Sequence, residues 1–170
     1  ERPAEITDAP AAQAPTEIAG ALRIEHLTYQ YPGSAVNAID DLSLSVDPGE
    51  TLAIMGRVGS GKTTLLKQIV RLIDPAPDRV FIDGYPVADY PLNQLRTQVA
   101  LVPQDPFLFA EPLKSNITYD DPARSLERIW EAATSADLKD TISDFPEQRD
   151  TLIGERGVTL SGRQNQRATL

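Results

Sequence analysis

The sequence predicts an α/β fold in which a phosphate-binding loop joins a buried strand to a helix. The loop is Gly-Arg-Val-Gly-Ser-Gly-Lys-Thr at 56–63, which matches the pattern G-x-x-x-x-G-K-[ST]. The apolar run at 51–55 before it is typical of a buried parallel strand. The run at 64–72 after it has apolar residues at helical spacing. The loop therefore lies where its chemistry requires it, between a strand and a helix.

The residue types of this loop suit a polyphosphate and a metal ion. The glycines let the backbone curl so that successive N–H groups point inward at phosphates, and the following helix adds its positive end. Lys62 supplies a mobile charge, and the Thr63 hydroxyl suits Mg²⁺. The alternative, a glycine-rich turn that binds nothing, is disfavoured by the flanking strand and helix. The expected nucleotide contacts here are Gly56, Arg57, Val58, Gly59, Ser60, Gly61, Lys62, Thr63 and Thr64.

Composition limits the class of protein. The chain has 170 residues and 41% hydrophobic content, which predicts one domain, or most of one, with a real core. It has no cysteine, which excludes disulfides, zinc ribbons and thiol catalysis. The net charge of −9 argues against nucleic acid as the main partner. We expect neither a membrane span nor a signal peptide in these residues, because no long apolar run is present.

The N-terminal part of the chain predicts a linker followed by strands. Residues 1–20 are rich in Pro, Ala and Glu, and are expected to form a linker. The ordered domain is expected to begin near Ala21. Alternating apolar residues predict strands at 22–29 and 39–46. A short strand is expected at 79–82.

The second half predicts mainly helices. A brief helix is expected at 92–98, followed by an apolar strand at 99–102. Residues 112–140 have helical spacing, with Leu126, Ile129, Trp130 and Ala133 on one face, and predict a helical insertion into the α/β core. An irregular loop is expected at 154–159. The segment 160–164, Leu-Ser-Gly-Arg-Gln, opens the last helix.

Three residues outside the loop are candidates for ligand contacts, and each has an alternative role. The Gln104 amide, after an apolar strand, could bind a metal or its water, or be an ordinary polar loop residue. Tyr31 could stack on a purine, although packing on a half-buried strand is favoured from the residues alone. Ser161 is equally consistent with an ordinary helix N-cap and with a second anion-binding helix terminus.

Taken in this order, the motifs resemble the nucleotide-binding domain of an ABC transporter of the exporter type, from about residue 21 onward. The resemblance implies ATP and Mg²⁺ as ligands. Tyr31 is similar to the aromatic residue that stacks on adenine, and residues 56–63 match Walker A. Gln104 is similar to the Q-loop glutamine, which contacts Mg²⁺ together with Thr63 and faces the transmembrane domains.

Two further motifs carry the resemblance. Residues 160–164 resemble the LSGGQ signature, and residues 154–157 resemble the exporter-specific X-loop, which touches the transmembrane domains. The family dimerises head to tail, as a homodimer or a heterodimer. This implies that Ser161, Gly162 and Gln164 of one domain contact the ATP held by Lys62 of the other.

The resemblance also implies an architecture. It predicts a P-loop NTPase (RecA-like) core with an N-terminal antiparallel β subdomain and an inserted α-helical subdomain at about 110–165, and with the Walker B half missing. Residues 21–170 would be a partial ABC ATP-binding domain, and 1–20 the linker from a preceding transmembrane domain. The expected function is to couple MgATP binding and hydrolysis to export, at the cytoplasmic face of the inner or plasma membrane.

The sequence departs from the family pattern in two ways. Arg163 stands where the signature usually has a second glycine, and the Walker B Asp, the catalytic Glu and the switch His are not found. His26 lies too early and is expected on the surface of the first strand. No catalytic residue is therefore assigned, and we expect these residues to be a fragment that binds nucleotide but hydrolyses it poorly. Two alternatives stay open: a soluble ABC-type ATPase that transports nothing, and a truncated nucleotide-binding module without turnover.

Overall fold

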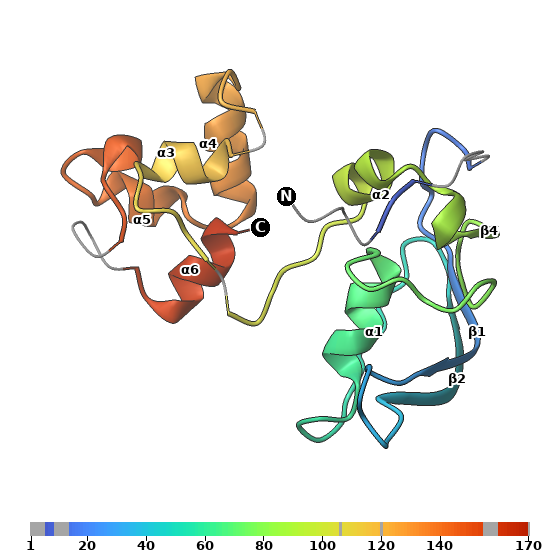
Figure 1. The fold of residues 1–170 in the computed structure, drawn as a ribbon. Helices are drawn as coiled ribbons and strands as arrows, with labels where there is room; N and C mark the ends of the chain where they lie inside the picture. The colour runs from blue at the N-terminus through green and yellow to red at the C-terminus, as the bar shows by residue number, and fades with distance from the viewer. Residues whose placement is uncertain (1–5, 9–13, 106, 120, 155–159, 170) are drawn as a thin grey trace. The chain divides into compact units, whose positions relative to one another are not determined.

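A computed structural model describes residues 6–8, 14–105, 107–119, 121–154 and 160–169. The chain divides into two compact units, Glu1–Leu101 and Val102–Leu170 (Figure 1). The first unit carries the sheet and the phosphate-binding loop, and the second is helical. Each unit is therefore considered separately.

The sheet of the first unit has four strands in the order β2-β1-β3-β4. The strands are β1 (Leu22–Tyr29), β2 (Ile39–Val46), β3 (Val80–Ile82) and β4 (Tyr85–Pro86). The three pairings are antiparallel, and Ile24 of β1 lies opposite both Leu44 and Val80. The strands predicted at 22–29, 39–46 and 79–82 are thus confirmed.

The β1–β2 pair contains an irregularity at His26. The register shifts between Ile24 and Leu27, and both His26 and Asp41 have positive φ, of 47° and 48°. His26 Nδ1 lies 2.7 Å from Asp41 Oδ1, and both side chains are exposed. This is the geometry of a bulge that twists the ladder, and it confirms that His26 lies on the surface of the first strand.

The helices of the first unit flank the loop and the sheet. They are α1 (Lys62–Ile69), the 3₁₀ turn η1 (Val87–Asp89) and α2 (Leu92–Gln98). The predicted helix at 92–98 is confirmed. The helix after the loop ends earlier than the predicted residue 72, because Arg71 takes a left-handed φ of 48°. The core of this unit is Ile24, Leu27, Ile39, Leu65, Val80, Ile82, Val87, Tyr90 and Leu95.

Two predicted strands are not formed. Residues 51–55 and 99–102 are not in a strand, and Leu52, Ile54 and Met55 are 46%, 41% and 92% exposed. A parallel strand needs neighbours on both sides and helices over both faces. None of the described residues pairs with 51–55 in a sheet, so the apolar run stays open to solvent.

The second unit is built from short helices. They are α3 (Leu113–Ile117), α4 (Leu126–Ser135), α5 (Lys139–Ser143), the 3₁₀ turn η2 (Gln148–Asp150) and α6 (Gly162–Ala168). Its core is Leu113, Ala133, Leu138, Ile142, Ile153, Leu160 and Ala168. The predicted helical region is confirmed, although it is broken into several helices. The loop expected at 154–159 lies almost wholly outside the described residues.

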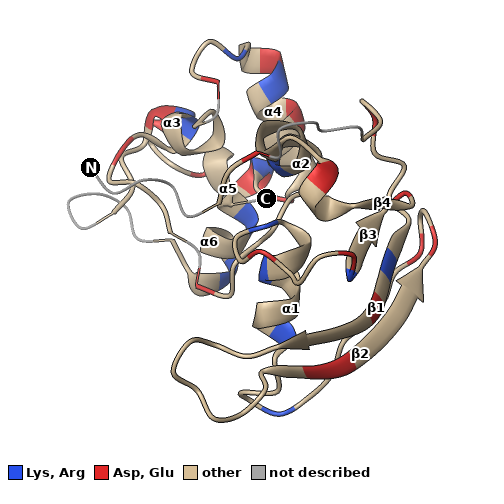
Figure 2. Cartoon of the chain, turned by 45° about the vertical axis from the view of Figure 1, so that its right-hand side comes forward, with Lys and Arg blue, Asp and Glu red and all other residues tan. Residues whose placement is uncertain are grey.

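Helix α4 illustrates how this unit forms. Ile129 and Ala133, four residues apart, are buried, while Leu126 is exposed. Leu126 belongs to the same helical face as predicted, but it lies in the first turn of the helix and stays exposed. The outer face carries both signs of charge, including the ion pair of Arg128 and Glu131 (Figure 2). Within the described ranges, no helix has the length and apolar character needed to cross a membrane.

Candidate functional site

The phosphate-binding loop depends most strongly on glycine at position 61, where a side chain cannot fit. Gly61 has φ of 86°, and a Cβ there would lie 2.1 Å from the carbonyl oxygen of Ala38. A Cβ on Gly56 would lie 2.5 Å from Ser60 Oγ. The first contact is with backbone and cannot be relieved by a rotamer change. The close approach of Gly61 to Ala38 thus fixes the loop against the segment before β2.

The Lys62 ammonium lies over the loop from which it emerges. Its Nζ donates hydrogen bonds to the carbonyls of Gly56 (2.9 Å) and Arg57 (2.8 Å), and to Ser60 Oγ (3.2 Å). These bonds hold a positive charge at the start of α1, and no side chain caps that helix end in the structure. A cation and free helix N–H groups in one place form an anion-binding arrangement.

Tyr31 lies beside the first turn of α1. Its hydroxyl is 3.0 Å from Thr64 Oγ1, and its ring meets Tyr29 edge to face at 5.0 Å. The ring is 40% exposed, so one part of it remains available to a ligand. The Tyr31 backbone carbonyl also accepts a hydrogen bond from the Ser34 N–H. Tyr31 is thus held in place by contacts on two sides.

A cavity of about 380 Å³ brings these predicted residues together. Its walls are Tyr31, the segment 34–38 and residues 59–64. The structure therefore places Tyr31, Lys62 and Thr63 around one space. The segment at 34–38 was missed at the sequence level, although the Pro32-Gly33 turn before it is a signal that the chain folds back there.

The residues of this cavity fit MgATP in chemistry. The loop offers backbone N–H groups and an ammonium for phosphate oxygens, and Thr63 offers the hydroxyl oxygen that Mg²⁺ accepts. Gln104 is exposed in the second unit. Because the two units are described separately, the sharing of one Mg²⁺ by Thr63 and Gln104 stays a prediction.

The predicted signature segment begins helix α6 through a capping box. The Gln164 N–H donates to Ser161 Oγ at 3.3 Å, and the Ser161 N–H donates to Gln164 Oε1 at 2.9 Å. These are the reciprocal bonds by which Ser and Gln start a helix. The N-cap role predicted for Ser161 is confirmed, while the anion-binding role stays a prediction. Gly162 and Arg163 are exposed.

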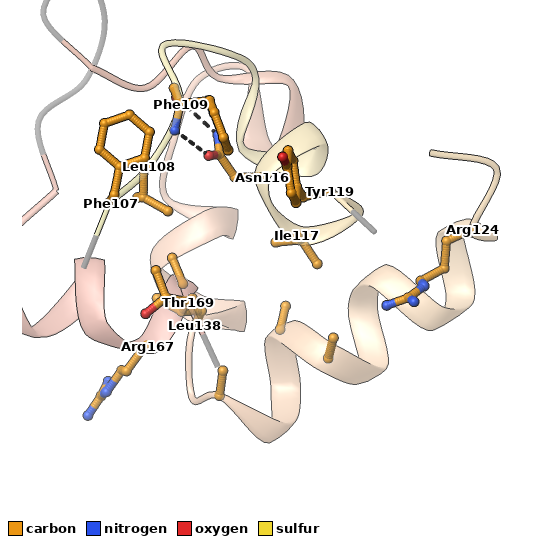
Figure 3. Close-up of a pocket in the computed structure, with 14 residues that line it drawn as sticks. Phe107, Leu108, Phe109, Asn116, Ile117, Tyr119, Arg124, Leu138, Arg167 and Thr169 are labelled. Atoms are coloured by element: carbon orange, nitrogen blue, oxygen red, sulfur yellow. Dashed lines mark hydrogen bonds between the residues drawn. The ribbon is translucent and has the colours of Figure 1, made fainter. Parts of the chain in front are cut away.

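The second unit also contains an aromatic groove of about 420 Å³ (Figure 3). We define it by Phe107, Phe109 and Tyr119. Phe107 meets Phe109 edge to face at 5.1 Å, and Phe109 stacks on Tyr119 at 4.8 Å. The Asn116 amide binds the backbone of Phe109 twice, accepting from its N–H at 2.7 Å and donating to its carbonyl at 3.2 Å. The Asn116 amide therefore fixes the backbone of Phe109, five residues after Gln104.

The family follows from comparison with known proteins. A family model described as "ABC transporter" matches residues 39–170. The chain belongs to the ABC transporter family. The match confirms the resemblance inferred from the motifs and the P-loop NTPase fold class.

Several relatives of this chain carry names that refer to export or to lipid flipping. The chain is 42% identical over 164 residues to YgaD of Bacillus subtilis, an ATP-binding/permease protein named for multidrug export, which covers 96% of this chain. It is 41% identical over 172 residues to an ATP-dependent lipid A-core flippase of Alkalilimnicola ehrlichii, covering 98%. A solved bacterial Atm1-family ABC exporter with ATP bound matches 97% of the chain, with 32% identity and a TM-score of 0.85.

The chain spans less than a third of the length of these relatives, namely 28% of the first and 29% of the other two. The exporter type of nucleotide-binding domain predicted from the motifs is confirmed. These similarities do not test the individual site residues, whose roles stay predictions.

Proposed function

We propose that this chain binds MgATP at residues 56–63 and works as the ATP-binding part of an exporter. The observation that carries the proposal is the cavity that Tyr31, Lys62 and Thr63 share. A stacking surface, a cation and a metal-binding hydroxyl around one space suit a purine nucleoside triphosphate. The names of two relatives, an ATP-binding/permease protein and an ATP-dependent flippase, support the same reading.

Each residue has a proposed role in nucleotide binding. The ammonium of Lys62 exchanges its bonds to Gly56 and Arg57 for bonds to the outer phosphates, while the N–H groups at the start of α1 orient them. Thr63 and Gln104 supply oxygen ligands for Mg²⁺, which when bound offsets the phosphate charge. Tyr31 stacks on the base and keeps it at the mouth of the cavity.

The other half of the ATP site is proposed to come from a second nucleotide-binding domain, either a copy of this chain or a related one. Ser161, Gly162 and Gln164 would contact the phosphates held by the partner's loop. The capping box supports this, because it fixes the start of α6, where Ser161, Gly162 and Gln164 lie. Arg163 is exposed on this helix, so its positive charge is available to the same phosphates.

The aromatic groove is proposed to receive a helix of the transmembrane part of the exporter. The groove begins at Phe107, three residues after Gln104 in sequence, and Phe107 and Tyr119 are 71% and 69% exposed. Exposed aromatic clusters of this kind mark interaction sites. The relative that combines ATP-binding and permease functions supports a transmembrane partner. Together with the 154–157 loop, the groove would transmit ATP-driven movement at the cytoplasmic face of the membrane.

The proposal is tested by measuring MgATP affinity by isothermal titration calorimetry. Lys62→Ala removes the ammonium from the loop and is expected to weaken binding at least about tenfold. Lys67→Ala is the matched control, since it removes the same charge from the far end of the same helix. We expect Lys67→Ala to bind as the wild type does.

Two results would contradict the proposal. Equal MgATP affinity for wild type and Lys62→Ala would show that the loop is not the binding site. If the wild type and Lys62→Ala release phosphate equally in the complete exporter, the proposed ATPase activity is wrong. That result would favour a nucleotide-binding module without turnover.

A further inference from the structure

The residues that precede β1 are bound to the first unit over much of their length. We call residues 14–21 the strap. Ala14 and Ile18 pack against the hydrophobic core. The next three backbone N–H groups, of residues 19–21, all donate to the Asp83 carboxylate, at 2.6, 3.0 and 2.8 Å. A carboxylate held by three N–H groups is a strong anchor, so this segment follows a fixed course up to β1.

Helix α2 holds the strap from another side through two glutamine side chains. The Gln98 amide accepts from the Ile18 N–H at 2.8 Å and donates to the Thr16 carbonyl at 2.8 Å. Gln94 donates to the Pro15 carbonyl. These bonds satisfy the strap backbone much as a neighbouring strand would.

Arg71 connects the phosphate-loop helix to the same region. It follows α1 directly, is buried, and its guanidinium donates to Asp74 (2.8 Å), the Thr7 carbonyl (3.2 Å) and the Ala88 carbonyl (3.4 Å). Its own carbonyl accepts from the Arg96 side chain of α2 at 2.7 Å. The side chain of Arg71 therefore joins the end of α1 to the N-terminal segment and to η1, and its backbone carbonyl adds a bond to α2.

We propose that the strap and Arg71 link nucleotide binding to the position of the N-terminal segment. Helix α1 starts at Lys62, inside the loop, and ends at Ile69, two residues before Arg71; its eight residues span about 12 Å. A helix moves as a stiff unit, so a shift of its first turn towards bound phosphates also moves Arg71 and its partners. Arg71 acts in this as a positioning residue. The inference rests on the proposed function, because it requires the loop to bind ATP.

The link predicts reciprocal effects. If MgATP binding stabilises the docked strap by some factor, then the docked strap raises the affinity for MgATP by the same factor. Hydrogen–deuterium exchange of the whole protein, with and without MgATP, measures one direction. In the wild type we expect MgATP to slow exchange of the strap amides at 16–21 by about fivefold. Loosening the strap with Gln94→Ala and Gln98→Ala together should abolish that slowing and change MgATP affinity by a similar factor.

The matched control is Asn93→Ala. Asn93 is an exposed residue of α2, and its side chain makes none of the strap contacts described above. It should behave as the wild type does in both measurements. Arg71→Lys keeps the charge but loses the planar fork of donors, and should also weaken the effect of MgATP on the strap.

The outcomes separate this inference from the proposed function. If MgATP protects residues 56–63 while exchange at 16–21 stays unchanged in the wild type, the link is wrong and the ATP site stands. If MgATP protects neither segment, the proposed ATP site itself is wrong. Equal effects of MgATP on the strap in the wild type and in the double glutamine variant would also overturn the role of α2.

Discussion

Among individual residues, Gln68 conflicts most clearly with its surroundings. It is fully buried on α1, and neither its amide nitrogen nor its amide oxygen has a hydrogen-bond partner among the described residues. Burying an unpaired amide costs about 1–3 kcal/mol. Gln68 lies on α1, the helix that follows the phosphate-binding loop, so the unpaired amide destabilises the helix closest to the site.

We expect Gln68→Leu to raise the free energy of unfolding by about 1–3 kcal/mol, because leucine fills a similar volume without unpaired polar atoms. Helix propensity contributes little, since glutamine and leucine rank closely. Urea denaturation of both proteins measures the change. Gln68→Glu is the companion variant and should lose stability, because it buries a charge. A Gln68→Leu protein less stable than the wild type would show that the amide has a partner.

At the scale of elements, α6 shows how a short helix is specified locally. It has seven residues, Gly162–Ala168, too few to be stable through propensity alone. The capping box between Ser161 and Gln164 satisfies two of its end groups. Its last turn packs through Ala168 on the core of the second unit. Both the cap and this packing are therefore needed to form the helix.

Ser161→Ala removes the cap and is expected to destabilise the second unit by about 1 kcal/mol. Ser143→Ala is the matched control, since its hydroxyl donates to the Lys139 carbonyl within its own helix. Exchange of the α6 amides at 163–166 should become faster in Ser161→Ala and stay unchanged in Ser143→Ala. Unchanged exchange in both variants would mean that packing alone holds the helix.

At the scale of the whole molecule, the exposed apolar run at 51–55 is the segment we expect to cause association with other chains. Leu52, Ile54 and Met55 are exposed and lie next to the loop. Apolar, β-prone segments that find no partner strand pair with other chains. The net charge of −9 opposes such association only at low salt, because salt screens it.

We therefore expect this 170-residue polypeptide by itself to associate through 51–55, increasingly so as salt rises. Leu52→Lys together with Ile54→Lys should reduce light scattering at equal concentration. Leu126→Lys, at an exposed leucine on α4, is the control and should have little effect. Equal scattering by the wild type and the double variant would place the association surface elsewhere.

Local patterns in the sequence were sufficient to predict the family and part of the fold. Alternation predicted β1 and β2, a short apolar segment predicted β3, and helical spacing predicted α2 and the helical half of the chain, because these elements bury one face against residues close by. The loop at 56–63 could be recognised from sequence because binding a phosphate requires glycines and a lysine at these spacings. The family follows from the same motifs.

The tertiary structure decided the rest. Whether 51–55 forms a strand depends on neighbours in a sheet rather than on its own composition, since an apolar run has no structure without partners. The space shared by Tyr31 and Thr63 depends on the segment at 34–38, which lies far from the loop in sequence but close to Gly61 in space. The proposed role of Arg71 could likewise not be predicted from sequence, because its partners Thr7, Ala88 and Arg96 are brought together only by folding. The sequence by itself determined the chemistry of the phosphate-binding loop, and long-range contacts determined what surrounds it.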